Sequence, residues 1–436
     1  MADDVAHSLA KPAEKKKRKL PQRLILCLDG TWNTADGATI TNIVRLRDML
    51  QPGDVGGIEQ RIYYDEGVGT RDFYDKWTGG GMGFGLDENV RQAYRFLSQF
   101  YDPGDEIYIF GFSRGAFAAR SIAGYIGASG LLKRESCTPE LEQRAWENYR
   151  VDSKNRYPSE DIFLKAHCHK GLRISVLGVF DTVGALGVPL TMMNWWNRNR
   201  FEFHDTALSS VISVSLQALA IDEKRGPFAP SLWKVPQHAS YDHVEQVWFP
   251  GVHSDTGGGY GDGGVGALTL KWMLDRVEML KGTGKAALVL RPGELAALQP
   301  DGLGTIHDSR TAAYIYSRYR PMLRVIAQQR PAPSSARRLA ALPLHARPLN
   351  EYIHVGVLER MKAGVDEAGD DYVPLNVKCA LDALLLTPTA QPVSLGFVGK
   401  KSHPLDWKAD RGDYDELALA LPAPYDAAFA ALYQRP

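Results

Sequence analysis

Short apolar runs alternate with amphipathic stretches along the first two-thirds of the chain. The apolar runs have the length and composition of strands and lie at residues 23–28, 61–64, 106–110, 172–180 and 243–249. Segments with helical spacing or helix-forming composition lie at residues 42–50, 86–100, 116–127, 140–149 and 266–280. Residues 211–220 fit either a strand or a helix. This alternation predicts an α/β protein with a mostly parallel central sheet and helices on both faces.

Outside this region the pattern changes. Residues 1–21 are polar and carry a short basic run, which indicates a solvated, disordered tail; a nuclear signal or a lipid-surface contact is the alternative. Residues 284–350 are rich in Ala, Leu, Pro and Arg and less well patterned, which predicts a cap or insertion. Ordered runs of apolar residues return in residues 351–400. We therefore expect one catalytic domain over 22–400 and a C-terminal extension over 401–436.

The composition narrows the classes of function. The chain has 436 residues, a formal net charge of zero and a 44% hydrophobic share, so nothing indicates binding to nucleic acid. Its four cysteines lie far apart, which favours reduced thiols. No run approaches the roughly 18 apolar residues of a membrane span, and the first ten residues lack the apolar core of a signal peptide. We expect synthesis in the cytoplasm, with signal-independent secretion left open.

The candidate chemistry starts at residues 111–115, Gly-Phe-Ser-Arg-Gly, between a predicted strand and a predicted helix. In this context G-x-S-x-G forms a sharp turn that exposes the hydroxyl of Ser113. Gly111 and Gly115 keep the turn small where the helix passes the strand. The N–H of Arg114 begins the helix and can face an oxyanion. The motif predicts a nucleophilic serine; the alternative is a glycine-rich turn with an incidental serine.

A second oxyanion donor is expected after the first strand, where the sequence reads Asp29-Gly30-Thr31. α/β-Hydrolases place this donor on a glycine-bearing loop after an early strand. The backbone N–H groups of Gly30 and Thr31 are therefore the candidates. Asp29 is expected to hold the loop by accepting backbone hydrogen bonds. A plain strand-to-loop turn would account for the same residues.

A serine nucleophile needs a base and a third group that orients the base. In α/β-hydrolases these groups follow strands, in the chain order serine, acid, histidine. Asp181 directly follows one predicted strand, and His253 lies in a glycine-rich loop after another. We predict a triad of Ser113, Asp181 and His253. Asp255 is the rival acid and His354, on a later apolar run, is the rival base; Asp181 as a strand-end cap and His253 as a core residue are the structural alternatives.

An apolar segment and a glycine-rich segment are candidates for the mouth of the site. The first contains Met192, Met193, Trp195 and Trp196, which fit a lid or interfacial element that meets lipid, or equally a core contact. The second, residues 79–85, lacks the spacing of a phosphate-binding loop and predicts a flexible loop.

Cys168 and the histidines on either side of it resemble a metal-ligand cluster. No second cluster at matching spacing exists in the sequence, so we predict neither a metal site nor a cofactor.

Five motifs, in order along the chain, carry a family likeness. They are residues 27–33 (Cys-Leu-Asp-Gly-Thr-Trp-Asn), 67–69 (Gly-Val-Gly), 111–115, 180–184 (Phe-Asp-Thr-Val-Gly) and 251–260 (Gly-Val-His-Ser-Asp-Thr-Gly-Gly-Gly-Tyr). Over about residues 22–380 they resemble a bacterial and fungal α/β-hydrolase family that includes the catalytic domain of type VI secretion phospholipase effectors. The resemblance implies an α/β-hydrolase fold, a triad at Ser113, Asp181 and His253, and esterase action on phospholipid acyl chains.

The sequence is therefore interpreted as a serine hydrolase of phospholipase A type that cleaves carboxylic esters through an acyl-enzyme. The alternatives are a soluble carboxylesterase or thioesterase and a non-catalytic binding module on the same fold. The expected partners are a lipid or ester substrate and a peripheral membrane contact. A secretion or immunity partner and the oligomeric state are left open.

Overall fold

The computed structural model describes most of the chain. The described residues are 20–30, 40–67, 82–183, 208–234, 243–281, 287–310, 321–328, 349–364, 371–387 and 395–433. The predicted basic tail lies outside them except for residues 20 and 21, and so do Thr31 and the segment with Met192, Met193, Trp195 and Trp196.

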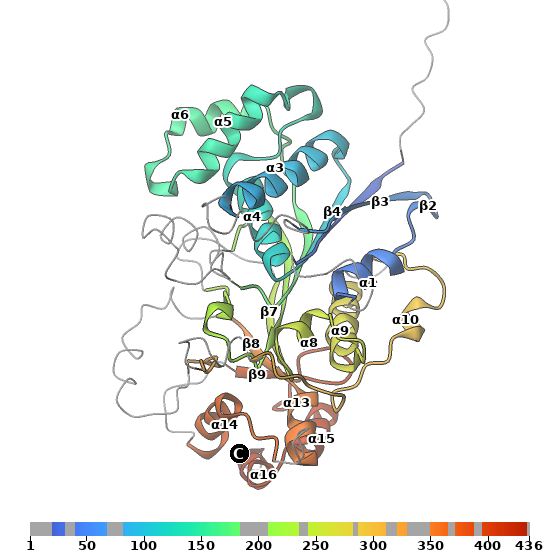
Figure 1. The fold of residues 1–436 in the computed structure, drawn as a ribbon, viewed down its shortest axis with the longest axis vertical. Coiled ribbons are helices and arrows are strands. Elements are labelled where there is room, and N and C mark those ends of the chain that lie inside the picture. Colours follow the sequence, from blue (N-terminus) through green and yellow to red (C-terminus); the bar gives the residue numbers. More distant parts are fainter. Residues whose placement is uncertain are drawn as a thin grey trace, which may run out of the picture.

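A nine-stranded sheet runs through the protein in the order β2-β3-β1-β4-β5-β6-β7-β8-β9 (Figure 1). The strands are β1 (Gln22–Leu28), β2 (Gly53–Val55), β3 (Ile58–Asp65), β4 (Glu106–Phe112), β5 (Ile174–Phe180), β6 (Ile212–Ala220), β7 (His243–Phe249), β8 (Glu351–His354) and β9 (Leu395–Val398). β2 is antiparallel to β3, and all other neighbouring strands are parallel. The prediction of a mostly parallel α/β sheet is confirmed.

Helices cover both faces of the sheet, with α3 to α6 on one side and α1, α8 and α9 on the other (Figure 1). The α-helices are α1 (Asn42–Met49), α3 (Met82–Phe100), α4 (Arg114–Ser129), α5 (Pro139–Arg150), α6 (Pro158–Ala166), α8 (His253–Gly257), α9 (Gly264–Lys281), α10 (Glu294–Ala297), α13 (Val355–Ala363), α14 (Leu375–Leu381), α15 (Arg411–Ala420) and α16 (Tyr425–Tyr433). Short helices of other types are the 3₁₀ turns η1 (Arg134–Ser136), η2 (Ser153–Asn155) and η3 (Gly226–Phe228) and the π-helical η5 (Asp382–Leu386).

Strand β1 shows why the central strands read as continuous apolar runs. Leu24 and Leu26 belong to the core on the α3 and α4 side, whereas Ile25 and Cys27 belong to the core on the α1 and α9 side. Successive side chains of a strand point to opposite faces, so a strand covered by helices on both faces must be apolar at every position.

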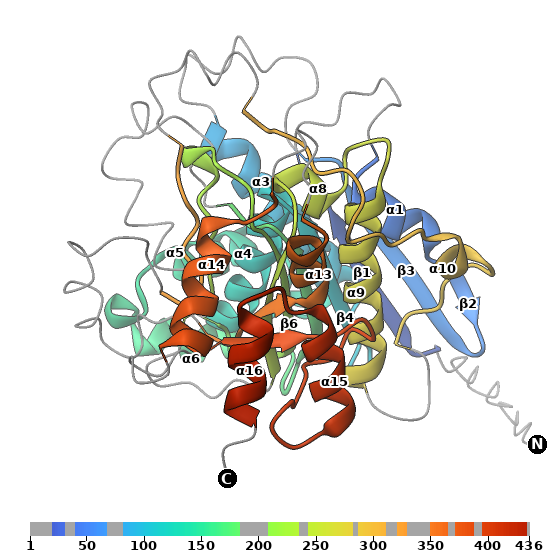
Figure 2. The same ribbon diagram turned by 90° about the horizontal axis from the view of Figure 1, so that it is seen from below.

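The C-terminal part of the chain builds a third core at the β8–β9 end of the sheet. Figure 1 shows α13, α14, α15 and α16 on the side of β8 and β9, and Figure 2 shows the same helices seen from below. Leu417 of α15 and Phe429 of α16 are buried in the same cluster as Ile353 of β8. The predicted extension 401–436 thus packs into a core shared with residues of the predicted catalytic domain, and a boundary at residue 400 stays a prediction.

Several local predictions differ from the structure. Residues 212–220, which the sequence left undecided, form strand β6. Helix α3 begins at Met82, so part of the predicted loop 79–85 is helical, which is tolerable because each glycine costs a helix only about 1 kcal/mol. His253 begins the short helix α8 rather than lying in a loop. The described parts of the predicted insertion 284–350 contain the short helix α10 and otherwise mainly irregular chain.

Candidate active site

Ser113 occupies a strained turn between β4 and α4. Its backbone has φ 57° and ψ −118°, a conformation that costs a non-glycine residue free energy and that occurs at functional sites. An added Cβ on Gly111 would overlap the backbone of Gly115, and one on Gly115 would overlap the carbonyl of Leu28. The two glycines of the motif therefore let the helix start directly beside the sheet.

His253 hydrogen-bonds both Ser113 and Asp181. Its Nε2 lies 2.9 Å from Ser113 Oγ, and its Nδ1 lies 2.6 Å from Asp181 Oδ2. The side chains of all three residues are buried. These distances suit the tautomer in which Nδ1–H donates to the carboxylate and Nε2 accepts from the serine hydroxyl. The structure therefore brings together the three residues that the sequence predicted as a triad.

The order of the strands explains why these three residues meet. Ser113 follows β4, Asp181 follows β5 and His253 follows β7, and these strands lie side by side in parallel with only β6 between β5 and β7. Their carboxyl ends therefore lie at one edge of the sheet. Asp181 has a positive φ of 40°, and its Oδ1 accepts from the N–H of Ala220, at the end of β6.

The imidazole of His253 is held between aromatic rings. Phe112 lies 4.7 Å from it and Phe228 lies 4.9 Å away, centroid to centroid. The approach of helix α8 also depends on glycine, because an added Cβ on Gly257 would overlap the ring of Phe112. Glycine at position 257 thus permits His253 to pack against the turn that carries Ser113.

Arg324 is a residue of this site that sequence reasoning missed. Its Nη1 donates to Asp181 Oδ1 at 2.6 Å and its Nη2 donates to Asp181 Oδ2 at 2.9 Å. Burial alone would raise the pKa of Asp181, but the charge of Arg324 and the bonds from Arg324 and His253 hold that pKa well below its usual range. Arg324 lies in the weakly patterned segment 284–350, and no local motif in the sequence indicates its role.

A second acidic group supports the backbone of His253. Glu223 Oε2 accepts from the N–H of His253 at 3.3 Å, and Glu223 Oε1 accepts from Ser309 Oγ at 3.0 Å. Glu223 also forms an ion pair with Arg225 at 2.8 Å. Burial would raise the pKa of Glu223, but the bond and charge of Arg225 outweigh this effect, so its pKa is lowered and the carboxylate stays ionised.

Asp255, the rival acid, serves its own loop instead of the His253 ring. Its carboxylate accepts from the N–H of Val252 at 2.8 Å and lies 2.6 Å from His307 Nδ1. The ring of Tyr260 stacks on that of His307 with a centroid distance of 3.5 Å. Asp255 thus caps helix α8 and ties it to residue 307 of the predicted insertion.

His354, the rival base, lies in a different environment from Ser113. It precedes α13, where its Nδ1 accepts from the N–H of Gly356 at 3.1 Å, and its ring stacks on Phe249. Burial lowers the pKa of His354 to about 3. These contacts are those of a buried helix cap.

The predicted oxyanion donors are only partly described. The N–H of Gly30 donates to Asp29 Oδ1 at 2.7 Å, and an added Cβ on Gly30 would lie 3.2 Å from the Cβ of Ser113. Gly30 therefore lies beside Ser113, and Asp29 accepts from the N–H of Gly30, as expected, and from Thr41 Oγ1. Arg114 is the first residue of α4. The oxyanion roles of Gly30, Thr31 and Arg114 stay predictions.

Cys168 and His169, which resemble part of a metal-ligand cluster in the sequence, make other contacts in the structure. Cys168 Sγ donates to the carbonyl of Ser129, and the ring of His169 meets that of Tyr101 edge to face. Among the described residues, no three His, Cys, Asp or Glu side chains are grouped so that they could hold a metal ion.

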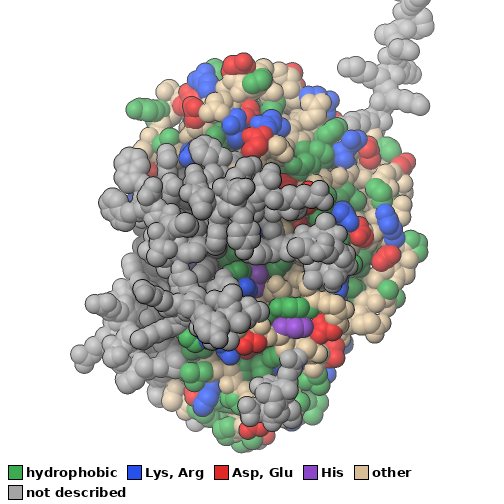
Figure 3. All heavy atoms as spheres, viewed as in Figure 1, with side chains coloured by type: hydrophobic (Ala, Val, Ile, Leu, Met, Phe, Trp, Pro, Cys, Tyr) green, Lys and Arg blue, Asp and Glu red, His purple; other side chains and the backbone are tan. Residues whose placement is uncertain are grey.

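None of the helices in the described ranges has the length and apolarity needed to cross a membrane. On the face drawn in Figure 3, the described basic and acidic side chains are interspersed.

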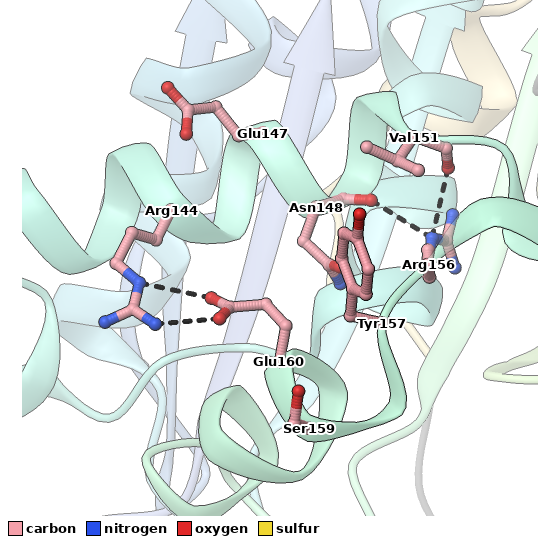
Figure 4. Close-up of a pocket in the computed structure, with 8 residues that line it drawn as sticks. All are labelled: Arg144, Glu147, Asn148, Val151, Arg156, Tyr157, Ser159 and Glu160. Carbon is pink, nitrogen blue, oxygen red and sulfur yellow. Dashed lines mark hydrogen bonds and ion pairs between the residues drawn. The ribbon is translucent and has the colours of Figure 1, made fainter.

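A pocket of about 360 Å³ lies between α5 and α6 (Figure 4). Its lining residues fall within 144–160, which includes none of Ser113, Asp181 and His253. Arg144 and Glu160 pair across it, with Nη2 and Oε2 2.7 Å apart. Arg156 donates to the carbonyls of Asn148 and Val151. No histidine lines this pocket, so it offers no serine–histidine pair for nucleophilic catalysis.

Fold and site together define a class of protein: an α/β protein whose parallel strand ends bring a serine, a histidine and an aspartate into one buried chain of hydrogen bonds. The chain belongs to the family described as "T6SS, Phospholipase effector Tle1-like, catalytic domain", whose model matches residues 22–276. This match confirms the resemblance to type VI secretion phospholipase effectors, over a shorter range than the expected residues 22–380. The assignment to the α/β-hydrolases stays a prediction.

Individual relatives are more distant. An uncharacterized protein of Saccharomyces cerevisiae, YEL023C, is 31% identical over 230 residues, which cover 48% of this chain and only about a third (32%) of that protein. The structure of the Tle1 effector bound to the VgrG spike from the type 6 secretion system is similar with a TM-score of 0.34 and 20% identity, covering 59% of this chain and 56% of that one. An uncharacterized protein from Pseudomonas aeruginosa gives a TM-score of 0.38 and 18% identity, covering 95% and 61%. Both TM-scores are too low to support a detailed comparison.

Proposed function

We propose that this protein is a serine hydrolase of the α/β-hydrolase type that cleaves carboxylic esters, with phospholipid acyl esters as its substrates. The observation that carries the proposal is the buried hydrogen-bond chain from Ser113 through His253 to Asp181. Family membership supports the phospholipase part of the proposal, because the matching family is described as phospholipase effectors.

In the first half-reaction His253 Nε2 takes the proton of Ser113 Oγ while Oγ attacks the acyl carbonyl carbon. The new C–O bond converts the carbonyl oxygen into an oxyanion. Collapse of this intermediate breaks the ester C–O bond, and the leaving alcohol takes the proton from His253 Nε2. The fatty acyl group is then bonded to Ser113 Oγ.

In the second half-reaction a water molecule replaces the alcohol. His253 accepts one proton of the water as its oxygen attacks the acyl-enzyme, and returns that proton to Ser113 Oγ when the fatty acid leaves. Asp181 keeps the imidazole in the required tautomer and stabilises the imidazolium. Backbone N–H groups near Ser113 stabilise the oxyanion, with those of Arg114 and Thr31 as the candidates. The N–H of Gly30 is a candidate only if it leaves Asp29 Oδ1, to which it donates.

Delivery by a type VI secretion system, together with a secretion partner, is a further part of this proposal. It rests on the family description alone and is not required by the chemistry.

The proposal is tested by fatty-acid release from phosphatidylcholine and phosphatidylglycerol vesicles, with wild type beside Ser113→Ala. Release by the wild type alone is expected, and analysis of the lysophospholipid then assigns the acyl position. Hydrolysis of a soluble short-chain ester without release from vesicles would refute the lipid substrate and favour a carboxylesterase or thioesterase. Activity on neither substrate would refute the hydrolase and favour a binding module.

A further inference from the structure

Arg324 is buried and donates hydrogen bonds through both terminal nitrogens of its guanidinium. Only 1% of the residue is exposed. Besides its two bonds to Asp181, its Nη1 donates to the carbonyl of Ala220 at 2.8 Å and its Nη2 donates to the carbonyl of Phe228 at 2.7 Å. Paired, parallel N–H bonds to a carboxylate fix the plane of that carboxylate as well as its position.

The two oxygens of Asp181 divide their partners between Arg324 and the rest of the site. Oδ1 accepts from Arg324 Nη1 and from the N–H of Ala220. Oδ2 accepts from Arg324 Nη2 and lies 2.6 Å from His253 Nδ1. Rotation of the carboxylate would break a bond to Arg324, so the oxygen that faces His253 is held in one direction.

The backbone around Arg324 is also fixed. The N–H of Met322 donates to the carbonyl of Lys224 at 2.9 Å, and the N–H of Ala327 donates to Glu351 Oε1 at 3.1 Å. Ile326 is buried in the third core. The guanidinium therefore projects from a segment that is anchored on both sides of it.

We propose that Arg324 is a positioning residue for the proposed hydrolysis, which clamps Asp181 so that Oδ2 meets His253 Nδ1 and keeps this buried carboxylate ionised. The inference rests on the proposed function. Arg324 lies beyond residues 22–276, the part of the chain that matches the family, and Ser309 and His307, which support helix α8, lie beyond it too. The site is therefore completed by a segment that the sequence pattern presents as an insertion.

Removal of the guanidinium changes the balance of charges around Asp181. Among the described residues, the charged or titratable groups that face Asp181 are Arg324 and His253, with Glu223 beyond His253. Without Arg324, burial raises the pKa of Asp181, so the carboxylate takes up a proton at a higher pH. Protonated Asp181 does not stabilise an imidazolium, and the acid side of the activity profile should move to higher pH.

The test compares Arg324→Ala, Arg324→Lys and the control Arg276→Ala in the full chain. Arg276 is likewise a buried arginine bound to a carboxylate, that of Glu245 in β7. Among the described hydrogen bonds of Glu245, none joins it to Ser113, Asp181 or His253. The readouts are kcat and KM for fatty-acid release from vesicles between pH 5 and 8, and the rate at which a fluorophosphonate modifies Ser113.

For Arg324→Ala we expect kcat to fall about 10²-fold with little change in KM, and the acid midpoint to rise by about one pH unit or more. Millimolar guanidinium should restore part of the turnover of this variant and not of Arg276→Ala. If Arg324→Ala fails to fold, Arg324→Lys carries the test, because a lysine cannot reproduce the paired bonds; about a 10-fold loss of kcat is expected.

Wild-type kcat and an unchanged pH midpoint in the folded variants would overturn the role of Arg324 while leaving the proposed function intact. Failure of the wild type both to release fatty acid and to react at Ser113 would overturn the proposed function and this inference with it.

Discussion

Two buried carboxylates in this protein each bind a histidine and an arginine, in very different places. In the Asp181 cluster, formed by Asp181, His253 and Arg324, the carboxylate follows the end of β5. In the Glu245 cluster, formed by Glu245, His243 and Arg276, the histidine and the glutamate lie in the first three residues of β7. The distance from histidine nitrogen to carboxylate oxygen is 2.6 Å in both.

The clusters differ in what lies on the other side of the histidine. His253 Nε2 faces the hydroxyl of Ser113, whereas no described serine, threonine or cysteine side chain hydrogen-bonds His243. The side chain of His243 is 34% exposed and that of His253 only 5%. A buried carboxylate that binds both a histidine and an arginine is therefore not enough to indicate catalysis. The Asp181 cluster differs from the Glu245 cluster in two features. It lies at the carboxyl ends of parallel strands, and it lies beside the strained turn at Ser113.

The largest expected effect contrasts the two histidines. His253→Ala should reduce turnover at least about 10³-fold, because the serine loses the group that takes its proton. His243→Ala should leave kcat close to that of the wild type. Steady-state fatty-acid release measures both, and circular dichroism checks the fold. Equal losses in the two variants would remove the distinction between the clusters.

The second-largest effect on kcat is expected when the two carboxylates, Asp181 and Glu245, are replaced in turn. Asp181→Asn should lower kcat about 10³- to 10⁴-fold at pH 7.5, because an amide no longer stabilises the imidazolium and disturbs the tautomer of His253. Glu245→Gln is the matched control and should retain kcat. A wild-type kcat in Asp181→Asn would show that this residue is a strand-end cap, as the structural alternative holds.

Substitutions in the Glu245 cluster should change the free energy of unfolding rather than the turnover. Arg276→Met leaves Glu245 buried with a weaker set of partners and should lower the free energy of unfolding by about 3 kcal/mol or more. Burial would raise the pKa of Glu245, but the bonds from His243 and Arg276 lower it below its ordinary value. The stabilisation is thus fully present above the unfolded pKa of about 4.3, and it is lost progressively as pH falls from there through the lower pKa of the folded state.

Urea unfolding at pH 7 and pH 4 compares wild type with Arg276→Met. The difference in unfolding free energy should be smaller at pH 4. A difference that grows at pH 4 would contradict the account of Glu245.

The smallest effect is expected at His354. His354→Gln should retain kcat and lower the free energy of unfolding by about 1 kcal/mol through the weakened cap of α13. Because burial lowers the pKa of His354 from 6.5 to about 3, the unfolded chain binds the extra proton more readily. The wild type therefore loses stability as pH falls from 6.5 toward 3, and the variant should lose less.

Unfolding of His354→Gln at pH 7.5 and pH 5 measures this change, and turnover at pH 7.5 measures the role of the histidine. An inactive, folded His354→Gln beside an active His253→Ala would reverse the assignment of the base.

Features with a local signature could be predicted from the sequence, namely the buried strands and the residues that directly follow them. The strands around Ser113 are buried on both faces and read as apolar runs, and the motif 111–115 marks the turn that follows β4. Asp181 and His253 could be predicted because each follows a strand end. These three residues are now found within hydrogen-bonding distance, while their catalytic roles stay proposals.

Long-range contacts from weakly patterned chain could not be predicted. Arg324 reaches Asp181 across 143 positions of sequence, and its segment has neither the period of a strand nor that of a helix. The helix at His253 was missed for a related reason. The five residues 253–257 run into the glycines 257–259 and therefore read as a loop, whereas the Asp255 cap and the packing of Gly257 against Phe112 favour a turn of helix.

The most direct test of the central claim is to map where a fluorophosphonate reacts in the wild type, His253→Ala and His243→Ala. The account predicts an adduct on Ser113 that forms rapidly in the wild type and in His243→Ala and at least about 10³-fold more slowly in His253→Ala. Modification of another residue, or labelling of Ser113 at the same rate in all three proteins, would contradict it.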